Sequence, residues 1–263
     1  MRSAFNIAPR VVVYPHGSPP PLVEEGWLAL AQFDSWPPPP LDSAPLPASD
    51  CAPESGRSGV HKRTVSAVAS ELSGLMAPHR HAVFGDGSHP TTRLCAGAVD
   101  LLCRQRPALA VLDVGTGTGI LARIAAARGA SYVAGTDIDP AAVACAKAHA
   151  ELDNVTSLGA SASGPAIGSR ASITNIHFSS EAPDHWGARF DLVVANILEA
   201  PLRALAPALC RALKPGGVLL MSGFTRPQAP ALHLSYETVG LQSAGDFSRD
   251  DWVLLKFTQS SSK

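Results

Sequence analysis

The 263-residue sequence has no long hydrophobic run, little net charge and few cysteines. A membrane-spanning helix needs about 18 consecutive apolar residues, and none is present, so no such helix is expected. With a net charge of -1 the chain has no overall basic field, and direct binding of nucleic acid is not expected. The five cysteines are odd in number, scattered and free of C-x-x-C pairs. This pattern favours reduced thiols inside a cell over a disulfide framework.

The sequence also lacks a clear metal-binding pattern. His79, His81 and His89 lie near one another, but no carboxylate or cysteine stands at a spacing typical of a metal site. We therefore expect no metal, and we interpret these histidines as solvated or structural.

Composition divides the chain into three parts. Residues 1–60 hold 12 of the 23 prolines and predict a largely irregular N-terminal segment. Within it, residues 10–14 predict one short strand and residues 25–33 a short helical stretch. Residues 61–258 predict the main folded domain, and residues 259–263 a frayed tail.

The location of the protein in the cell is predicted from the same composition. Residues 1–23 carry arginines and no acid, as organelle transit peptides do. Several prolines oppose the amphipathic helix that such a peptide forms. A cytoplasmic location is the prediction, with organelle import as the alternative.

The most informative stretch covers residues 108–139. An apolar run of strand length ends at the sequence GTGTG, a helix follows over residues 120–127, and a second strand over residues 132–136 ends on an acidic turn. This order predicts a βαβ unit of a parallel sheet. A ligand is expected where such strands end.

The spacing of the glycines narrows the choice of ligand. Ile120 stands where a dinucleotide fingerprint requires its third small residue, and no phosphate-binding loop is present. Gly115 and Gly117 allow close approach of the backbone, and Asp137, 22 residues after Gly115, can accept hydrogen bonds from ribose hydroxyls. The arrangement resembles the S-adenosylmethionine site of class I methyltransferases. The alternatives are an ordinary βα turn of another α/β enzyme and a nicotinamide-dependent oxidoreductase.

The rest of the chain alternates between helical and strand patterns, which predicts an α/β fold. Helices are predicted for residues 65–75, 93–102 (capped by Thr91 or Thr92), 141–150, 201–213 and 227–239. Strands are predicted for residues 173–178, 190–195, 218–221, 241–246 and 252–257, with a flexible insertion over residues 153–170 and a turn over residues 214–217.

Three segments together resemble one family. They are FGDGSHPTTRLC at residues 84–95, the glycine-turn unit at residues 111–143, and DLVVANILEAPLRALAP at residues 191–207. Their order and spacing are similar to the ribosomal protein L11 methyltransferase (PrmA) family over residues 80–257. The lysine methyltransferase of the electron-transfer flavoprotein beta subunit shares this core.

The resemblance implies a fold, a cofactor and an activity. The fold would be Rossmann-like, with a mostly parallel seven-stranded sheet, an antiparallel closing strand and helices on both faces. The cofactor would be S-adenosylmethionine, and the reaction N-methylation of lysine or N-terminal amino groups of a protein such as a large-subunit ribosomal protein. The alternatives are another protein lysine, as in the flavoprotein enzyme, and a cofactor-binding interaction protein without catalysis.

The resemblance also implies site residues. Thr92 would contact the cofactor, Gly115 and Gly117 would lie against it, and Asp137 would bind its ribose. Asn196 would lie at the cofactor's edge beside the incoming amine, with a catalytic role. Each residue also has a purely structural interpretation: Thr92 and Asp137 as helix caps, the glycines as turn residues, and Asn196 as a partner of local backbone.

Two features depart from the family pattern. Residues 1–60 are too rich in proline to form the whole N-terminal domain with which family members grip their ribosomal protein. Asp86 lies between two glycines where the family usually has threonine. We also predict that residues 84–92 form a mobile cover over the cofactor, because glycines flank its polar centre.

Overall fold

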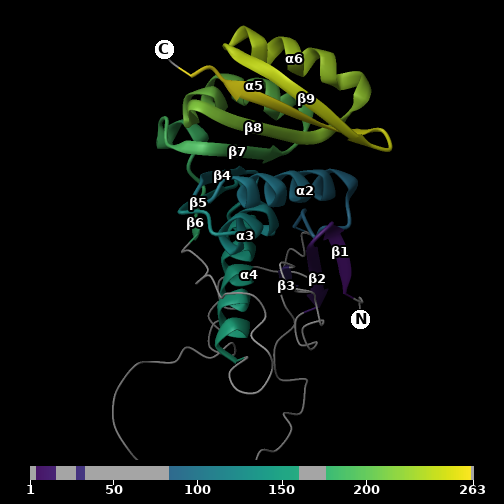
Figure 1. Ribbon diagram of the computed structural model, residues 1–263, viewed down its shortest axis with the longest axis vertical. Helices are drawn as coiled ribbons and strands as arrows, with labels where there is room; N and C mark the ends of the chain where they lie inside the picture. Colours follow the sequence, from purple (N-terminus) through teal and green to yellow (C-terminus); the bar gives the residue numbers. More distant parts are fainter. Residues whose placement is uncertain (1–3, 16–27, 33–82, 160–175, 262–263) are drawn as a thin grey trace, which may run out of the picture.

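The structure, a computed structural model, describes residues 4–15, 28–32, 83–159 and 176–261 (Figure 1). These residues form a central seven-stranded sheet covered by helices, and a separate three-stranded sheet from the N-terminal part of the chain. Among the described residues, no helix is long and apolar enough to cross a membrane.

The central sheet confirms the predicted topology. Its strand order is β6-β5-β4-β7-β8-β10-β9. Strands β4 to β8 pair in parallel, and β10 runs antiparallel to both β8 and β9. The strands are β4 (Ala110–Val114), β5 (Tyr132–Thr136), β6 (Ile176–Ser179), β7 (Phe190–Asn196), β8 (Leu213–Thr225), β9 (Leu241–Arg249) and β10 (Trp252–Gln259).

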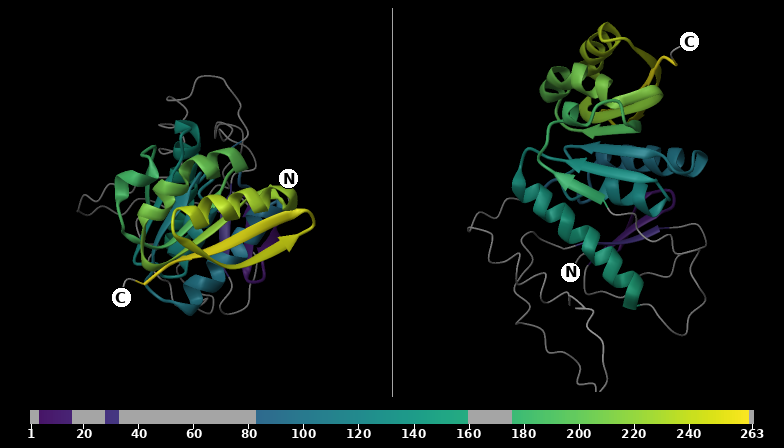
Figure 2. Two further views of the ribbon diagram at one scale, coloured as in Figure 1. Left: turned by 90° about the horizontal axis from the view of Figure 1, so that it is seen from above. Right: turned by 90° about the vertical axis from the view of Figure 1, so that its left-hand side faces the viewer.

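Helices cover both faces of this sheet, as predicted (Figures 1 and 2). One face packs against α2, α3 and α4, and the other against α5 and α6. The helices are α2 (Pro90–Gln105), α3 (Ile120–Ala127), α4 (Pro140–Gly159), α5 (Glu199–Ala212) and α6 (Ala229–Thr238), with short 3-10 turns η2 (Pro183–Trp186) and η3 (Arg226–Gln228).

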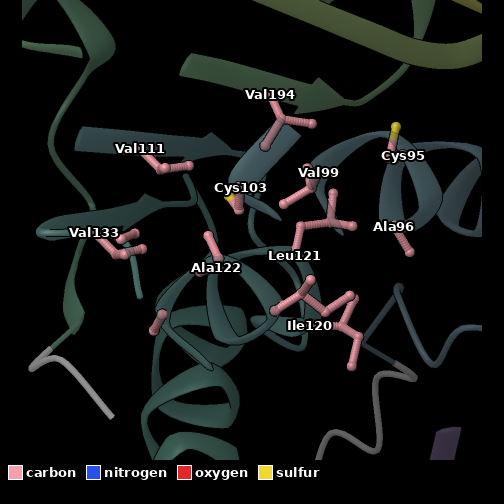
Figure 3. Close-up of a cluster of buried hydrophobic side chains, with 14 of the residues drawn as sticks. Cys95, Ala96, Val99, Cys103, Val111, Ile120, Leu121, Ala122, Val133 and Val194 are labelled. Atoms are coloured by element: carbon pink, nitrogen blue, oxygen red, sulfur yellow. The ribbon is translucent and has the colours of Figure 1, made fainter. Parts of the chain in front are cut away.

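Successive side chains of a strand point to opposite faces of the central sheet, which explains why both faces are apolar. In β4, Val111 belongs to the core on the α2–α3 side, and its neighbour Leu112 belongs to the core on the α5–α6 side. Figure 3 shows Val111 among side chains from α2 and α3, including Val99 and Leu121. Strands buried on both faces need near-continuous apolar sequence, which β4 and β7 have.

The small sheet contains β1 (Phe5–Ala8), β2 (Val11–Pro15) and β3 (Leu28–Gln32). Strand β1 pairs antiparallel with β2, and β3 pairs parallel with β2. The predicted strand over residues 10–14 is confirmed. The predicted helical stretch over residues 25–33 is wrong where the structure describes it, and the described parts of residues 1–60 are largely a sheet.

A buried ion pair explains why residues 28–32 form a strand. Arg123 of α3 donates to both carboxylate oxygens of Asp153 of α4, at 2.7 and 2.8 Å. Asp153 accepts from the backbone N–H of Ala31 at 3.3 Å, and Arg123 donates to the carbonyl of Ala31. These tertiary bonds outweigh local helix propensity and hold β3 beside α4. The predicted domain boundary between residues 60 and 61 lies outside the described residues.

The structure corrects the boundaries of several elements. Helix α2 begins at Pro90, and its N-cap is His89, not Thr91 or Thr92. Helix α4 continues to Gly159, into the segment predicted as a flexible insertion. The rest of that insertion and the helix predicted over residues 65–75 lie outside the described residues.

The predicted turn over residues 214–217 is also wrong. These residues belong to β8, where Gly216 adopts a φ of 75° and the register with β7 shifts between Phe190 and Leu192. A glycine with positive φ allows such an irregularity without ending the strand. At the other end of the domain, β10 continues through Gln259, the first residue of the predicted tail.

Candidate active site

All five predicted site residues lie at one end of the central sheet. Gly115 and Gly117 follow β4, Asp137 follows β5, and Asn196 ends β7. These three strands are neighbours and parallel, so their carboxyl ends meet at the same edge. Thr92 reaches this edge from the first turn of α2. The fold therefore brings the five predicted residues together at the end of the sheet where ligands of such folds bind.

The glycine turn is tied to the end of β5. The N–H groups of Gly115 and Thr116 both donate to the carbonyl of Thr136, at 2.8 and 2.9 Å. Gly115 and Gly117 have φ values of 71° and 53°. A Cβ on Gly115 would lie 2.1 Å from Cγ2 of Ile197. The glycines are therefore required by their conformation and by the close approach of other protein atoms.

Asp137 is positioned by backbone donors. Its Oδ2 accepts from the N–H of Gly117 at 3.0 Å, and its Oδ1 accepts from the N–H of Asp139 at 3.0 Å. Asp139, rather than Asp137, accepts from the N–H of Ala141 at the start of α4. The helix-cap interpretation of Asp137 is therefore wrong. Each carboxylate oxygen retains a lone pair, so two ribose hydroxyls can still be accepted.

An apolar side chain stands exposed beside this carboxylate. Ile138 follows Asp137 directly and is 96% exposed, the largest exposure among the large hydrophobic residues that the structure describes. It was not predicted as a site residue, although its position next to the acid was visible in the sequence. An exposed isoleucine next to this carboxylate offers an apolar surface to a flat ring.

Asn196 and Thr92 form a buried pair across 104 positions of sequence. Nδ2 of Asn196 donates to Oγ1 of Thr92 at 3.3 Å. Thr92 is 1% exposed and Asn196 is 9% exposed. Oδ1 of Asn196 has no hydrogen-bond partner among the described residues. A buried oxygen without a partner is costly, so this acceptor suits a donor supplied by a ligand or substrate.

The loop of residues 84–89 lies against the glycine turn. Phe84 and Gly85 both accept hydrogen bonds from Thr118 through their carbonyls. Oδ1 of Asp86 accepts from the N–H and the hydroxyl of Ser88, at 2.9 and 2.5 Å. These bonds turn the carboxylate of Asp86 toward its own loop, which accommodates this departure from the family sequence.

His89 has a structural role at the N-terminus of α2. Its Nδ1 accepts from the N–H of Thr91 and lies 2.8 Å from the Thr91 hydroxyl. The ring contacts Phe84 and Trp252 edge-on, with centroids 5.3 and 4.6 Å apart. In the described ranges no three His, Cys, Asp or Glu side chains are arranged to hold a metal. His79 and His81 lie outside those ranges.

Asp113 stabilises the glycine turn from within the sheet, a role that was not predicted from the sequence. Its Oδ2 accepts from the hydroxyl of Thr116 at 2.7 Å and from the N–H of Ala122 at 3.2 Å. Burial raises the pKa of this carboxyl to about 7, although the bonds from Thr116 and Ala122 oppose the shift. The sequence pattern that indicates this role is an acid in an apolar strand just before a glycine turn.

This pKa predicts a pH dependence of stability. Between the ordinary carboxyl pKa of 3.8 and the raised pKa of about 7, the folded protein keeps a proton on Asp113 that the unfolded chain has released. Raising the pH through this window therefore lowers the free energy of unfolding, by at most about 1.4 kcal/mol per pH unit. Asp113→Asn should lack this contribution. Urea unfolding at pH 5 and pH 8 measures it, and parallel pH profiles for wild type and variant would contradict the assignment.

A solved structure shares the fold of the chain. The ribosomal protein L11 methylase of Lactobacillus delbrueckii subsp. bulgaricus has a TM-score of 0.65 and 21% identity, and the match covers 98% of this chain and all of that one. The mostly parallel seven-stranded sheet, with its antiparallel strand β10 and the glycine turn after β4, defines a class I S-adenosylmethionine-dependent methyltransferase fold.

The family follows from sequence comparison. The family model for ribosomal protein L11 methyltransferase (PrmA) matches residues 81–260. The chain is 44% identical to the ribosomal protein L11 methyltransferase of Dechloromonas aromatica and 39% identical to that of Chloroflexus aurantiacus, each over 65% of this chain. The chain belongs to the ribosomal protein L11 methyltransferase family, and its cofactor is S-adenosylmethionine. It spans about half the length of these relatives, 50% and 54%.

Proposed function

We propose that the protein transfers a methyl group from S-adenosylmethionine to amino nitrogens of a protein, with ribosomal protein L11 as the substrate. The single observation that carries this proposal is Oδ1 of Asn196, a buried acceptor without a partner among the described residues. Family membership and the names of the relatives support the substrate.

The residues present fit the cofactor. Asp137 would accept hydrogen bonds from the ribose hydroxyls, and Ile138 would lie against the adenine ring. The glycine turn would lie beneath the methionine part, with Thr92 at the edge of the pocket. When bound, the cofactor supplies a methyl group on a positively charged sulfur with a neutral sulfide as leaving group.

The protein's own contribution would be to orient and desolvate the amine. A lysine amine has an unperturbed pKa of about 10.4, so it must lose a proton before it can attack. Because Nδ2 of Asn196 donates to Thr92, Oδ1 is the atom left to accept an N–H of the neutral amine. Rate enhancement would then come mainly from alignment with the methyl group and removal of water.

Two alternative functions make different predictions. A protein lysine outside the ribosome, as in the flavoprotein enzyme, would leave the site chemistry unchanged and alter only the substrate. A cofactor-binding protein without catalysis would bind S-adenosylmethionine and transfer nothing.

The free thiols of Cys95, Cys103, Cys145 and Cys210 support a cytoplasmic location for either activity.

A transfer assay tests the proposal. The full chain is incubated with cofactor carrying a radiolabelled methyl group and recombinant ribosomal protein L11, or a cell extract. Labelled L11, with the methyl groups located on amines by mass spectrometry, is the expected result. A different labelled protein would support the flavoprotein-type alternative, and cofactor binding without any labelled protein would support the non-catalytic one.

A further inference from the structure

One side chain joins two segments of the site that are far apart in sequence. The N–H of Thr118, in the glycine turn, donates to the carbonyl of Phe84 at 3.1 Å. Its hydroxyl donates to the carbonyl of Gly85 at 2.5 Å, a bond across 33 positions. The residue is 4% exposed, so water competes little for these bonds.

The loop is in close contact with the turn. A Cβ on Gly117 would lie 2.3 Å from the carbonyl oxygen of Phe84, and a Cβ on Gly85 would lie 3.2 Å from Oγ1 of Thr118. Gly85 has a φ of 104°, which presents its carbonyl to Thr118 at no steric cost. Gly85 in the loop and Gly117 in the turn therefore allow the loop to lie directly on the turn.

The other end of the loop leads to the buried pair of Thr92 and Asn196. Nε of Arg93 donates to the carbonyl of Gly87 at 3.1 Å, and His89 caps α2 one turn before Thr92. Thr92 in turn accepts from Asn196. A short chain of contacts therefore runs from Thr118 through the loop to Asn196.

We propose that Thr118 is a positioning residue that holds the loop of residues 84–89 closed on the glycine turn, in the conformation that binds the cofactor. The two hydrogen bonds of Thr118 keep the glycine turn and the Thr92–Asn196 pair next to each other. They favour the closed, binding-competent conformation, so their loss lowers the apparent affinity for the cofactor. This inference rests on the proposed function for the use of that site, and it concerns binding rather than transfer.

The test compares Thr118→Val with Thr118→Ser. Valine keeps the size of the side chain and the backbone N–H but removes the hydroxyl, while serine retains it. S-adenosylhomocysteine is titrated calorimetrically, and amide hydrogen exchange is measured over residues 84–89. For Thr118→Val we expect Kd to rise about three- to tenfold and loop exchange to accelerate. Thr118→Ser should stay close to wild type in both measurements.

Thr116→Val is the matched control for loop exchange. Its hydroxyl belongs to the same turn but donates to Asp113, so loop exchange should remain as slow as in wild type. Wild-type affinity and loop exchange in Thr118→Val would overturn the proposal, as would equal losses in the serine variant. Failure of the wild type to bind the ligand would contradict the proposed function instead, and exchange in the ligand-free proteins would still decide the role of Thr118.

Discussion

Asp137→Ala should weaken S-adenosylmethionine binding by on the order of 100-fold. The carboxylate accepts from the backbone of Gly117 and Asp139, and a lone pair on each oxygen remains for a ribose hydroxyl. Hydrogen bonds to a charged group are worth about 1.5–3 kcal/mol each. If each bond is worth the lower end of this range, the loss of two accounts for the expected loss of affinity of about 100-fold. Isothermal titration of the cofactor against wild type and variant measures the change.

Asp139→Ala provides the control for this prediction. Asp139 lies two residues further along and is exposed, and its carboxylate accepts from the N–H of Ala141. Its removal should cost about 1 kcal/mol of stability through the lost helix cap and leave cofactor affinity close to wild type. Equal affinity in wild type and Asp137→Ala would show that Asp137 does not bind the ribose.

Asn196→Leu should lower the turnover rate by about 100-fold, since misplacement of an attacking group costs about this much. Leucine is similar in size but removes both the acceptor for the amine and the bond to Thr92. The effect should fall mainly on kcat, with a smaller loss of cofactor affinity. Single-turnover methyl transfer and cofactor titration separate the two quantities.

Ser222→Ala is the corresponding control. Ser222 pairs with Asn196 in the β7–β8 register, is fully buried, and donates its hydroxyl to the carbonyl of Val253 at 2.7 Å. This variant should lose about 1 kcal/mol of stability and keep the wild-type turnover rate. A turnover rate in Asn196→Leu within a few-fold of wild type would remove Asn196 from the reaction, even if the protein is less stable.

Local sequence was sufficient for the elements around the glycine turn. Helix α3 and strand β5 have the predicted bounds, because the apolar periodicity and the flanking glycines act within a few residues. The N-terminus of α2 was misplaced because the cap is a histidine, a residue type outside the usual N-cap preferences. Strand β3 was missed because its partners, β2 and the Arg123–Asp153 pair, lie elsewhere in the chain.

The sequence by itself determined the α/β class and the cofactor, and it predicted five site residues, because glycine spacing, the acid after β5 and the asparagine after β7 are local patterns at strand ends. Only the tertiary structure decided how these residues act together. It paired Asn196 with Thr92, which leaves Oδ1 of Asn196 without a partner among the described residues, and it placed Thr118 against Phe84 and Gly85. These contacts join residues 33 to 104 positions apart. Residues so far apart in sequence are brought together by the packing of the whole sheet and its helices. No local sequence pattern specifies that packing.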